Sequence, residues 1–182
     1  HLGVDRGADL HPFIGYNFRI SELHAAVGLA QIKKLDTFLS IQRKNNKLLR
    51  SYLEQVPGIQ FRSVPDEAGD SCSFLSWMLP TEASTKAAIE SLKEAGVFAG
   101  NFYWYANNWH YITKWDHLKN ATTLNRMHDA QTAALLALQT RSFAKSDAIM
   151  SRTVSTAISL LWTEDQIKEK GEKMLAAITK VL

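Results

Sequence analysis

Apolar residues recur at steps of three and four along the first third of the chain, which is the spacing of one face of an α-helix. This pattern predicts a first helix over residues 20–36 and a second from about residue 36 to residue 56. The second helix should end at Pro57-Gly58, because proline cannot continue the hydrogen-bond ladder. Residues 1–15 carry no sustained period, so we expect a loop there. The stripe of the first helix consists of Ile20, Leu23, Val27, Ala30 and Leu35.

Shorter patterns follow residue 57 and predict strands that alternate with helices. The last helix has a clear start, because residues 163–166 form a capping box. The order of elements predicts a small α/β sandwich with a mainly antiparallel sheet and flanking helices. We expect strands at 59–62, 72–79, 97–105 and 150–161, and helices at 85–94 and 130–138.

Composition places the chain among globular domains without basic clusters. Its 182 residues are 46% hydrophobic and 21% charged, which is enough for a real core. The net charge of +3 is spread along the chain, and its densest basic run, residues 43–47, lies on a predicted helix that also carries apolar residues. We therefore expect no nucleic-acid partner.

Cysteine usage and hydropathy bear on the compartment. Cys72 is the one cysteine and no signal peptide precedes it, which together favour the reducing cytoplasm. Its position in an apolar run predicts a buried structural thiol rather than a nucleophile. No run of eighteen apolar residues occurs, so we expect no membrane span.

Self-contained catalytic motifs are missing from the sequence. It has no glycine-rich phosphate loop, no G-x-S-x-G elbow and no H-E-x-x-H. His110 and His117 are seven residues apart with Asp116 between them, but no third ligand stands at metal spacing, so no metal is expected. Composition and spacing alone indicate no more than a soluble α/β unit.

The segment over residues 15–36, GYNFRISELHAAVGLAQIKKLD, carries more information. It resembles the G-x-N-x-R-[MI]-[ST]-E-x-x-A-A-x-G-L-x-Q-L-x-K-L-D signature of DegT-type sugar aminotransferases, which depend on pyridoxal phosphate (PLP). Physically, the segment presents the amide of Asn17 and the guanidinium of Arg19 just before a helix, and these groups suit phosphate or carboxylate recognition. Locally, Asn17 could instead cap the helix while Arg19 pairs with Glu22.

The resemblance implies the C-terminal part of a fold type I PLP aminotransferase. Residues 1–56 would then be the end of the large domain with the interdomain helices, including the motif loop 15–22. Residues 57–182 would form the small C-terminal α/β domain. Members of the family are homodimers with active sites at the subunit interface. The helices over 20–56 should therefore expose hydrophobic surface in this chain.

The cofactor implied by the resemblance is PLP. Asn17 matches the family asparagine that reaches the PLP phosphate of the partner subunit, and Arg19 matches an arginine near cofactor or substrate. The lysine that binds PLP lies upstream of the motif in the family, before His1. The chain is therefore expected to be a fragment that holds no catalytic residue and is inactive alone, and Lys33 and Lys34 are not candidates.

An aromatic-rich segment over residues 101–118 is the candidate for substrate contact. Three tryptophans and three tyrosines stand within residues 103–115, and sugar sites combine aromatic faces with amides and imidazoles. We predict sugar contact for Tyr103, Asn108, Trp109 and His110, although such aromatics can also fill a core, as we expect for Phe102 and Trp115. Together with residues 146–152, the segment resembles the family branch that aminates the C8 aldehyde of an octulosonate sugar (8-amino-3,8-dideoxy-octulosonate transaminase).

The expected reaction is transfer of an amino group, with glutamate as donor, to a keto- or aldehyde-sugar. Two alternatives stay open on these residues. A PLP-dependent sugar dehydratase of the same family has histidine where the aminotransferases have lysine. A non-catalytic regulator could also use the same scaffold.

Overall fold

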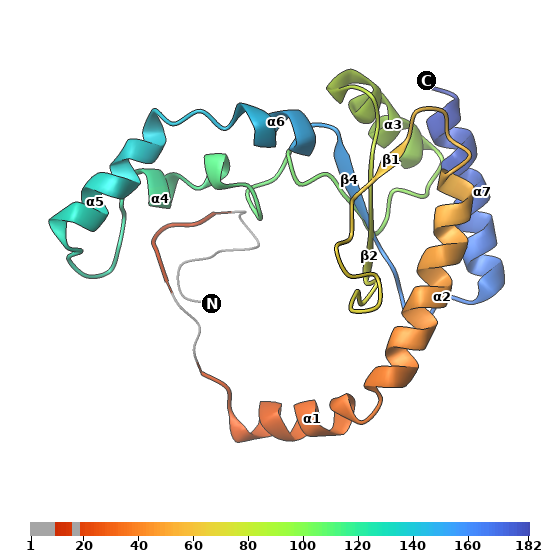
Figure 1. Ribbon diagram of the computed structural model, residues 1–182, viewed down its shortest axis with the longest axis horizontal. Coiled ribbons are helices and arrows are strands. Elements are labelled where there is room, and N and C mark those ends of the chain that lie inside the picture. The colour runs from red at the N-terminus through yellow and green to blue at the C-terminus, as the bar shows by residue number, and fades with distance from the viewer. Residues whose placement is uncertain (1–9, 16–18) are drawn as a thin grey trace. The chain divides into compact units, whose positions relative to one another are not determined.

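The computed structural model describes residues 10–15 and 19–182 and divides the chain into two compact units (Figure 1). The sheet unit comprises Leu23–Tyr103 and Ser151–Leu182. The loop unit joins the described residues between 10 and 22 with Trp104–Met150. Both units are discontinuous in sequence. The boundary at residue 56, which concerns how the chain would join a large domain, stays a prediction.

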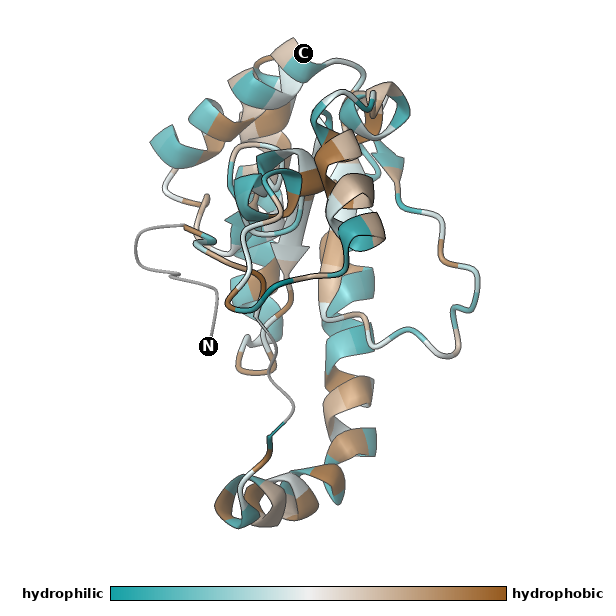
Figure 2. Ribbon diagram, turned by 90° about the vertical axis from the view of Figure 1, so that its left-hand side faces the viewer, coloured by the Kyte–Doolittle hydropathy of each residue, from teal (hydrophilic) through white to brown (hydrophobic). Residues whose placement is uncertain are grey.

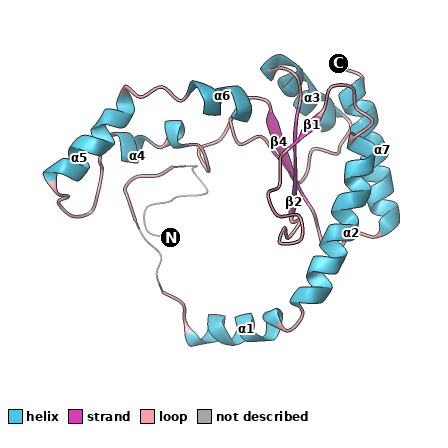
Figure 3. Ribbon diagram, viewed as in Figure 1, coloured by secondary structure: helices cyan, strands magenta, loops and turns pink. Residues whose placement is uncertain are grey.

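The sheet unit contains a four-stranded sheet in the order β1-β2-β4-β3. Figure 3 labels β1, β2 and β4 of this sheet. Each of its pairings is antiparallel, as the sequence predicted. The longest pairing joins β2 to β4, with Ser76 opposite Ser155 at its centre. The strands are β1 (Gln60–Phe61), β2 (Phe74–Met78), β3 (Asn101–Phe102) and β4 (Thr153–Ala157), and the helices are α1 (Glu22–Ile32), α2 (Leu35–Leu53), α3 (Glu82–Glu94) and α7 (Glu164–Thr179).

All four strands are shorter than the predicted ranges, and the difference is largest for β3 and β4. The run over 97–105 supplies only β3, because Gly96 and Gly100 adopt positive φ angles of 69° and 79° and turn the chain on both sides of residues 97–99. The run over 150–161 supplies only β4, and Met150 instead ends the helix α6 (Ala144–Met150). Hydrophobic runs therefore overestimated strand length where turns cut them.

The core lies between the sheet and the helices α2, α3 and α7. Helix α7 packs against both α2 and α3, while α2 also contacts β2. Alternate β2 residues, Leu75 and Trp77, are buried, as expected for a strand with one covered face. The fully buried large side chains include Leu49, Leu53, Leu79, Leu92, Ile167, Met174 and Ile178.

A buried chain of hydrogen bonds crosses the centre of the sheet. The indole Nε1 of Trp77 donates to Thr156 Oγ1 at 3.0 Å. The Thr156 hydroxyl in turn donates to Asn101 Oδ1 at 2.5 Å. The Asn101 amide donates to the carbonyls of Val97 and Phe98 at 3.0 and 3.2 Å. Each polar side-chain group in this series of hydrogen bonds has a partner. The bonds therefore connect strands β2, β4 and β3 without leaving a buried polar group unsatisfied.

Side-chain caps set where two helices of the sheet unit begin. The predicted capping box of α7 is confirmed, because Thr163 and Gln166 bond reciprocally to each other's backbone N–H. Helix α3 begins at Glu82, three residues before the predicted start, because Thr81 and Ser84 form a second capping box. Serine at the third helical position was not recognised as a capping residue in the sequence.

The predicted exposed hydrophobic surface is found on α1. None of its residues is buried. Leu23 is 73% exposed and Leu29 is 66% exposed, and brown apolar residues run along this helix in Figure 2. The first helix is shorter than predicted, because a turn at Lys33-Lys34 separates it from α2. The apolar stripe that the sequence shows is therefore real, and the described residues of this chain do not cover it.

The loop unit is built from short helices. These include α4 (Asp116–Lys119), α5 (Asp129–Leu136) and α6, with 3₁₀ turns at Ile112–Lys114 and Ala137–Gln139. The helix predicted at 130–138 is confirmed as α5, whereas α4 and α6 are too short to leave a clear period in the sequence. In the described part of the chain, no helix is long and apolar enough to cross a bilayer.

The buried hydrogen-bond chain makes a test of sheet stability possible. Thr156→Val keeps the shape of the side chain but leaves Trp77 Nε1 and Asn101 Oδ1 without partners inside the core. We expect a loss of roughly 2–4 kcal/mol in the free energy of unfolding, measured by urea titration with circular dichroism. The exposed control Thr37→Val should change it by less than about 0.5 kcal/mol. Equal effects of the two substitutions would show that these buried hydrogen bonds do not stabilise the sheet.

Candidate functional site

The predicted cofactor contacts lie just before α1. Arg19 is exposed, and among the described residues no ion pair joins it to Glu22. The local alternative in which these two side chains neutralise each other is therefore not formed. Asn17 lies outside the described residues. The guanidinium of Arg19 can donate to an anion, which is the chemistry that a phosphate requires.

Tyr103, one of the predicted sugar contacts, is buried in the sheet unit. Its hydroxyl donates to the carbonyl of Ser151 at 2.8 Å. Tyr103 directly follows β3, and Ser151 stands shortly before β4. The bond therefore joins the two points where the chain leaves the sheet and returns to it. Because its proton is committed to the backbone, this hydroxyl cannot donate to a sugar, and a contact of Tyr103 would rest on its ring.

Trp109 and His110, predicted sugar contacts, lie exposed in the loop unit, and Trp109 is 39% exposed. The ring of Trp104 meets His110 edge-on at 4.6 Å between centroids and lies 6.0 Å from Trp109. The backbone N–H of Trp109 is held by Asn107 Oδ1 at 3.0 Å. These contacts present aromatic surface together with an imidazole, which is a combination suited to sugar binding.

Asn108, the remaining predicted sugar contact, is anchored through its backbone. Its carbonyl accepts a hydrogen bond from Trp115 Nε1 at 2.6 Å, and His11 Nε2 lies 2.6 Å from the same oxygen. Trp115, expected in the core, is half-buried. His11 was not found by sequence reasoning, because it stands outside any period or motif and meets Asn108 across 97 residues.

Tyr111 is a buried residue of the aromatic segment. Only 4% of it is exposed, and its hydroxyl donates to Asp147 Oδ1 on α6. Burial, and then the hydrogen bond to that carboxylate, raise the pKa of Tyr111 to about 12. The phenol is therefore neutral at physiological pH and serves to tie the aromatic segment to α6.

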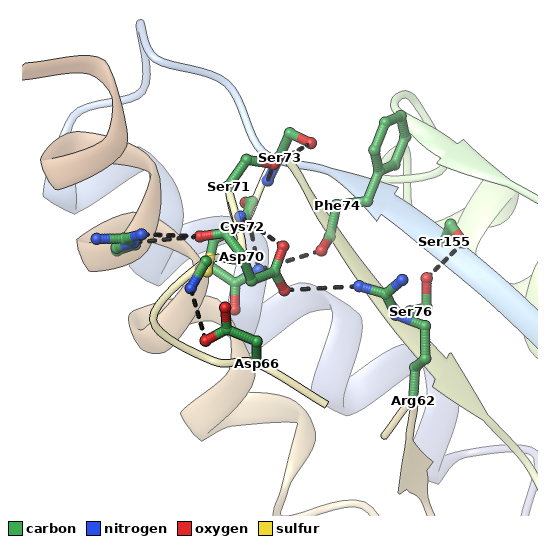
Figure 4. Close-up of polar contacts among 12 residues, drawn as sticks. Arg62, Asp66, Asp70, Ser71, Cys72, Ser73, Phe74, Ser76 and Ser155 are labelled. Carbon is green, nitrogen blue, oxygen red and sulfur yellow. Dashed lines mark hydrogen bonds and ion pairs between the residues drawn. The ribbon is translucent and has the colours of Figure 1, made fainter. Parts of the chain in front are cut away.

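A groove of about 480 Å³ lies in the sheet unit between α2, β2 and the loop over residues 62–73. Figure 4 shows how the loop residues Asp66, Asp70 and Cys72 gather there opposite Arg62. The groove carries both signs of charge. Its cations are Arg43, Lys47, Arg50 and Arg62, and its anions are Glu54, Glu67 and Asp70.

Most of these charged side chains are engaged in hydrogen bonds or ion pairs, several of them to the loop over residues 62–73. The guanidinium of Arg43 donates to the carbonyl of Ala68 at 2.5 Å and to that of Asp70 at 3.2 Å. Arg62 lies 3.5 Å from the Asp70 carboxylate, and Arg50 bonds to Glu54 at 2.8 Å. The groove is therefore a structural junction between α2 and the loop, with its cations largely committed.

Cys72 lies in this loop and not inside a strand, which corrects the sequence prediction. It precedes β2, is only half-buried and adopts a positive φ of 55°. The Asp70 carboxylate accepts its backbone N–H at 3.1 Å, and Asn46 donates to its carbonyl at 3.4 Å. Burial, followed by the charge of Asp70, raises the pKa of the thiol. A protonated thiol is a poor nucleophile, which agrees with a structural role.

Metal ligands do not gather in the described part of the chain. No group of three or more histidine, cysteine, aspartate or glutamate side chains has the geometry to hold an ion there. His110 and His117 do not form such a group with Asp116.

Comparison with known protein families and curated proteins identifies similar sequences. A profile of the DegT/DnrJ/EryC1/StrS aminotransferase family matches residues 2–174. The GDP-4-keto-6-deoxy-D-mannose 3-dehydratase of Escherichia coli O55:H7 is 32% identical over 96 residues, which cover 48% of this chain and 24% of that protein. The corresponding enzyme of Yersinia pseudotuberculosis is 33% identical over the same length and the same shares of the two chains. The chain thus spans about a quarter of these relatives.

Solved structures share the fold at low sequence identity. The chain superposes on 3-amino-5-hydroxybenzoic acid synthase with a TM-score of 0.60 and 22% identity, over 93% of this chain and 42% of that one. It superposes on PseC of Helicobacter pylori, an aminotransferase of pseudaminic acid biosynthesis, with a TM-score of 0.64 and 15% identity, over 92% and 40% of the two chains. These likenesses establish the fold.

The brace on the loop can be tested with Cys72 as a reporter, since it is the one cysteine of this chain. The charge of Arg43 lowers the thiol pKa, so removing that charge alone would slow thiolate chemistry. We nevertheless expect Arg43→Met to speed the reaction of Cys72 with a chromogenic disulfide by roughly tenfold, because the loss of its bonds to the loop carbonyls opens the loop.

The matched control is Lys47→Met, which removes a cation from the same groove. In the described chain, Lys47 makes no bond to the loop, so this substitution should leave the rate unchanged or lower it. A rate for Arg43→Met that also falls or stays constant would contradict the bracing role.

Proposed function

Because the chain belongs to the DegT/DnrJ/EryC1/StrS aminotransferase family, we propose that it is the C-terminal part of an enzyme that transfers an amino group from glutamate to a keto- or aldehyde-sugar with the help of PLP. The observation that carries this proposal is the family match over residues 2–174, which includes the motif before α1. The residue that binds PLP covalently would stand upstream of this chain.

PLP, when bound, acts as an electron sink that lets an amino group move between carbon atoms. The residues of this chain that fit its phosphate are Asn17 and Arg19. Support for Arg19 comes from its exposure and from the lack of an ion pair to Glu22 in the described chain, which leaves its donors available. Asn17 enters through the motif alone. Their proposed task is to bind and orient the phosphate, and not to move protons.

The aromatic segment is the proposed sugar side of the site. Trp109 would contact the C–H face of a sugar, while His110 and Asn108 supply groups for its hydroxyls. Tyr103 would contribute through its ring only, since its hydroxyl is bonded to Ser151. The character of this segment supports an octulosonate with an aldehyde at C8 as the substrate, because it combines bulky aromatic rings with polar groups suited to a long, polyhydroxylated chain.

A homodimer with shared active sites is the proposed assembly. The apolar residues of α1 that stay exposed in this chain support it, because a soluble protein rarely leaves such a patch uncovered. In that arrangement, Asn17 and Arg19 would serve the cofactor of the partner subunit. We also propose that the protein is located in the cytoplasm, because a single cysteine is typical of proteins in a reducing compartment.

A sugar 3-dehydratase is the second candidate, and a specific observation favours it. The curated relatives matched at about a third identity are 3-dehydratases that act on nucleotide-linked deoxysugars. The two reactions share PLP and a sugar substrate, and the described residues fit both. What separates them is the residue at the upstream cofactor position, lysine in one case and histidine in the other.

The reaction is tested with the protein extended upstream of His1. We expect the purified protein, given PLP, glutamate and an aldehyde- or keto-sugar, to form an amino-sugar together with 2-oxoglutarate, both detected by mass spectrometry. A product that has lost a hydroxyl without gaining nitrogen would establish the dehydratase instead. If neither product forms with any sugar of these classes, both enzymatic proposals fail and the regulator survives.

Binding of PLP tests the role of Arg19 separately. In the same protein, Arg19→Ala should weaken PLP binding by roughly tenfold or more, measured by absorbance titration, because a charge-assisted hydrogen bond is lost. Lys33→Ala is the matched control, since it removes an equal charge from the turn after α1 and should leave the affinity unchanged. Equal affinities of the two variants would remove Arg19 from the site.

A further inference from the structure

The segment over residues 10–15 is attached to the part of the loop unit that follows the aromatic segment. The backbone N–H of Ile14 donates to the carbonyl of Thr122 at 2.9 Å, and Ile14 forms an isolated parallel bridge with Thr123. This segment stands directly before the motif that carries Arg19. The proposed phosphate loop therefore directly follows a strip, residues 10–15, whose backbone is hydrogen-bonded to the loop unit.

A second attachment joins His11, three residues before Ile14, to Asn108. The Asn108 carbonyl meets two ring nitrogens, Nε2 of His11 and Nε1 of Trp115, each at 2.6 Å. A carbonyl oxygen has two lone pairs and can accept both bonds. The next residue, Trp109, has its backbone N–H bonded to Asn107 Oδ1 at 3.0 Å. The backbone is thus held immediately before the exposed rings of Trp109 and His110.

Ring packing keeps His11 in place. Its ring stacks on that of His117 with centroids 5.2 Å apart and an interplanar angle of 23°. It also lies 5.7 Å from the ring of Trp115. The three rings form one cluster, since Trp115 and His117 are themselves 6.1 Å apart. His11 therefore combines a hydrogen bond to the aromatic segment with two ring contacts to it.

We propose that His11 is a positioning residue, which holds the Asn108 carbonyl and so fixes the backbone from which Trp109 and His110 contact the sugar. This inference rests on the proposed function, because the sugar side of the site belongs to it. His11 does not touch the substrate. Its role is to couple the strip before the phosphate loop to the segment that selects the sugar.

The bond at Asn108 requires His11 to carry its proton on Nε2, because the carbonyl can only accept. The side-chain amide of glutamine places a donor nitrogen at nearly the position of Nε2. His11→Gln should therefore keep the hydrogen bond while losing the stack, whereas His11→Ala loses both. Trp115→Phe removes the other donor and keeps an aromatic ring.

The cluster also has a built-in sensitivity to acid. Nδ1 of His117 is buried without a partner in the described chain. Burial, followed by the neighbouring His11, lowers the pKa of His117, while Asp116, itself paired with Lys119 at 2.6 Å, opposes this shift. Because the folded-state pKa lies below the unfolded value of about 6.5, the cluster is fully stable above that pH and weakens as the pH falls below it.

The experiment uses the protein extended upstream of His1 and two readouts. The first is the hydrogen-exchange protection of amides 106–112. We expect His11→Ala to lower it by roughly tenfold, with substantial recovery in His11→Gln. The second is steady-state kinetics with the sugar. The KM for the sugar should rise roughly tenfold in His11→Ala and in Trp115→Phe, while the KM for glutamate stays constant.

Acidification supplies a further check. Protection of the same amides should fall below about pH 6.5 in the parent protein but not in His117→Phe, which keeps a stacked ring without a titrating group. A parent without activity on any sugar would refute the proposed function, and protection would still report whether His11 fixes the segment. Unchanged protection in His11→Ala, or lowered protection with an unchanged sugar KM, would overturn the positioning role.

Discussion

The buried hydrogen bonds from Trp77 through Thr156 to Asn101 are the constraint on which the rest of the structure depends. They join strands that are far apart in sequence, since α3, β3 and residues 104–150 lie between β2 and β4. An apolar core could bury the same rings in several registers, whereas a chain of donors and acceptors is satisfied in only one. The register of β3, β2 and β4 is set there, and the packing of α2 and α7 follows from it.

This register has a direct consequence for the candidate site. Strands β3 and β4 are paired neighbours, yet residues 104–150 are inserted between them in the chain. The bond from Tyr103 to Ser151 closes the entry of that insertion. A long loop between paired strands adds only a slowly growing entropy cost, so the sheet can carry it. The insertion can then hold aromatic residues without disturbing the core of the sheet unit.

Much of the sheet unit could be predicted from sequence because its signals are local. The spacing of apolar residues located α2, although this helix ends at Leu53 and not directly before Pro57. Thr163 and Gln166 marked the start of α7, and an apolar run located β2. Strand ends failed where Gly96 and Gly100 turned the chain, because their positive φ angles are set by the surrounding fold. Cys72 was assigned to a strand because an apolar run follows it, although Arg43 and Asn46 hold it in a loop.

The candidate site was only partly predictable. The motif around Arg19 stands in a fixed register and can be recognised from the chain alone. The aromatic segment was visible as composition, but composition could not separate Tyr103, whose hydroxyl is bonded to the backbone, from the exposed Trp109. His11 left no signal, because its partners Asn108, Trp115 and His117 are about a hundred residues away and no periodicity connects them.

The central claim is that this chain contributes Arg19 and Asn17 to an active site whose cofactor-binding residue belongs to a partner subunit. Mixing two inactive forms of the upstream-extended protein tests it most directly: one with Asn17 and Arg19 both changed to Ala, the other with its covalent cofactor residue changed to Ala. Refolding the two together should restore activity, because mixed dimers would contain one site with every required residue. A mixture that stays as inactive as its components, with mixed dimers shown to form, would place both sets of residues in the same subunit and contradict the account.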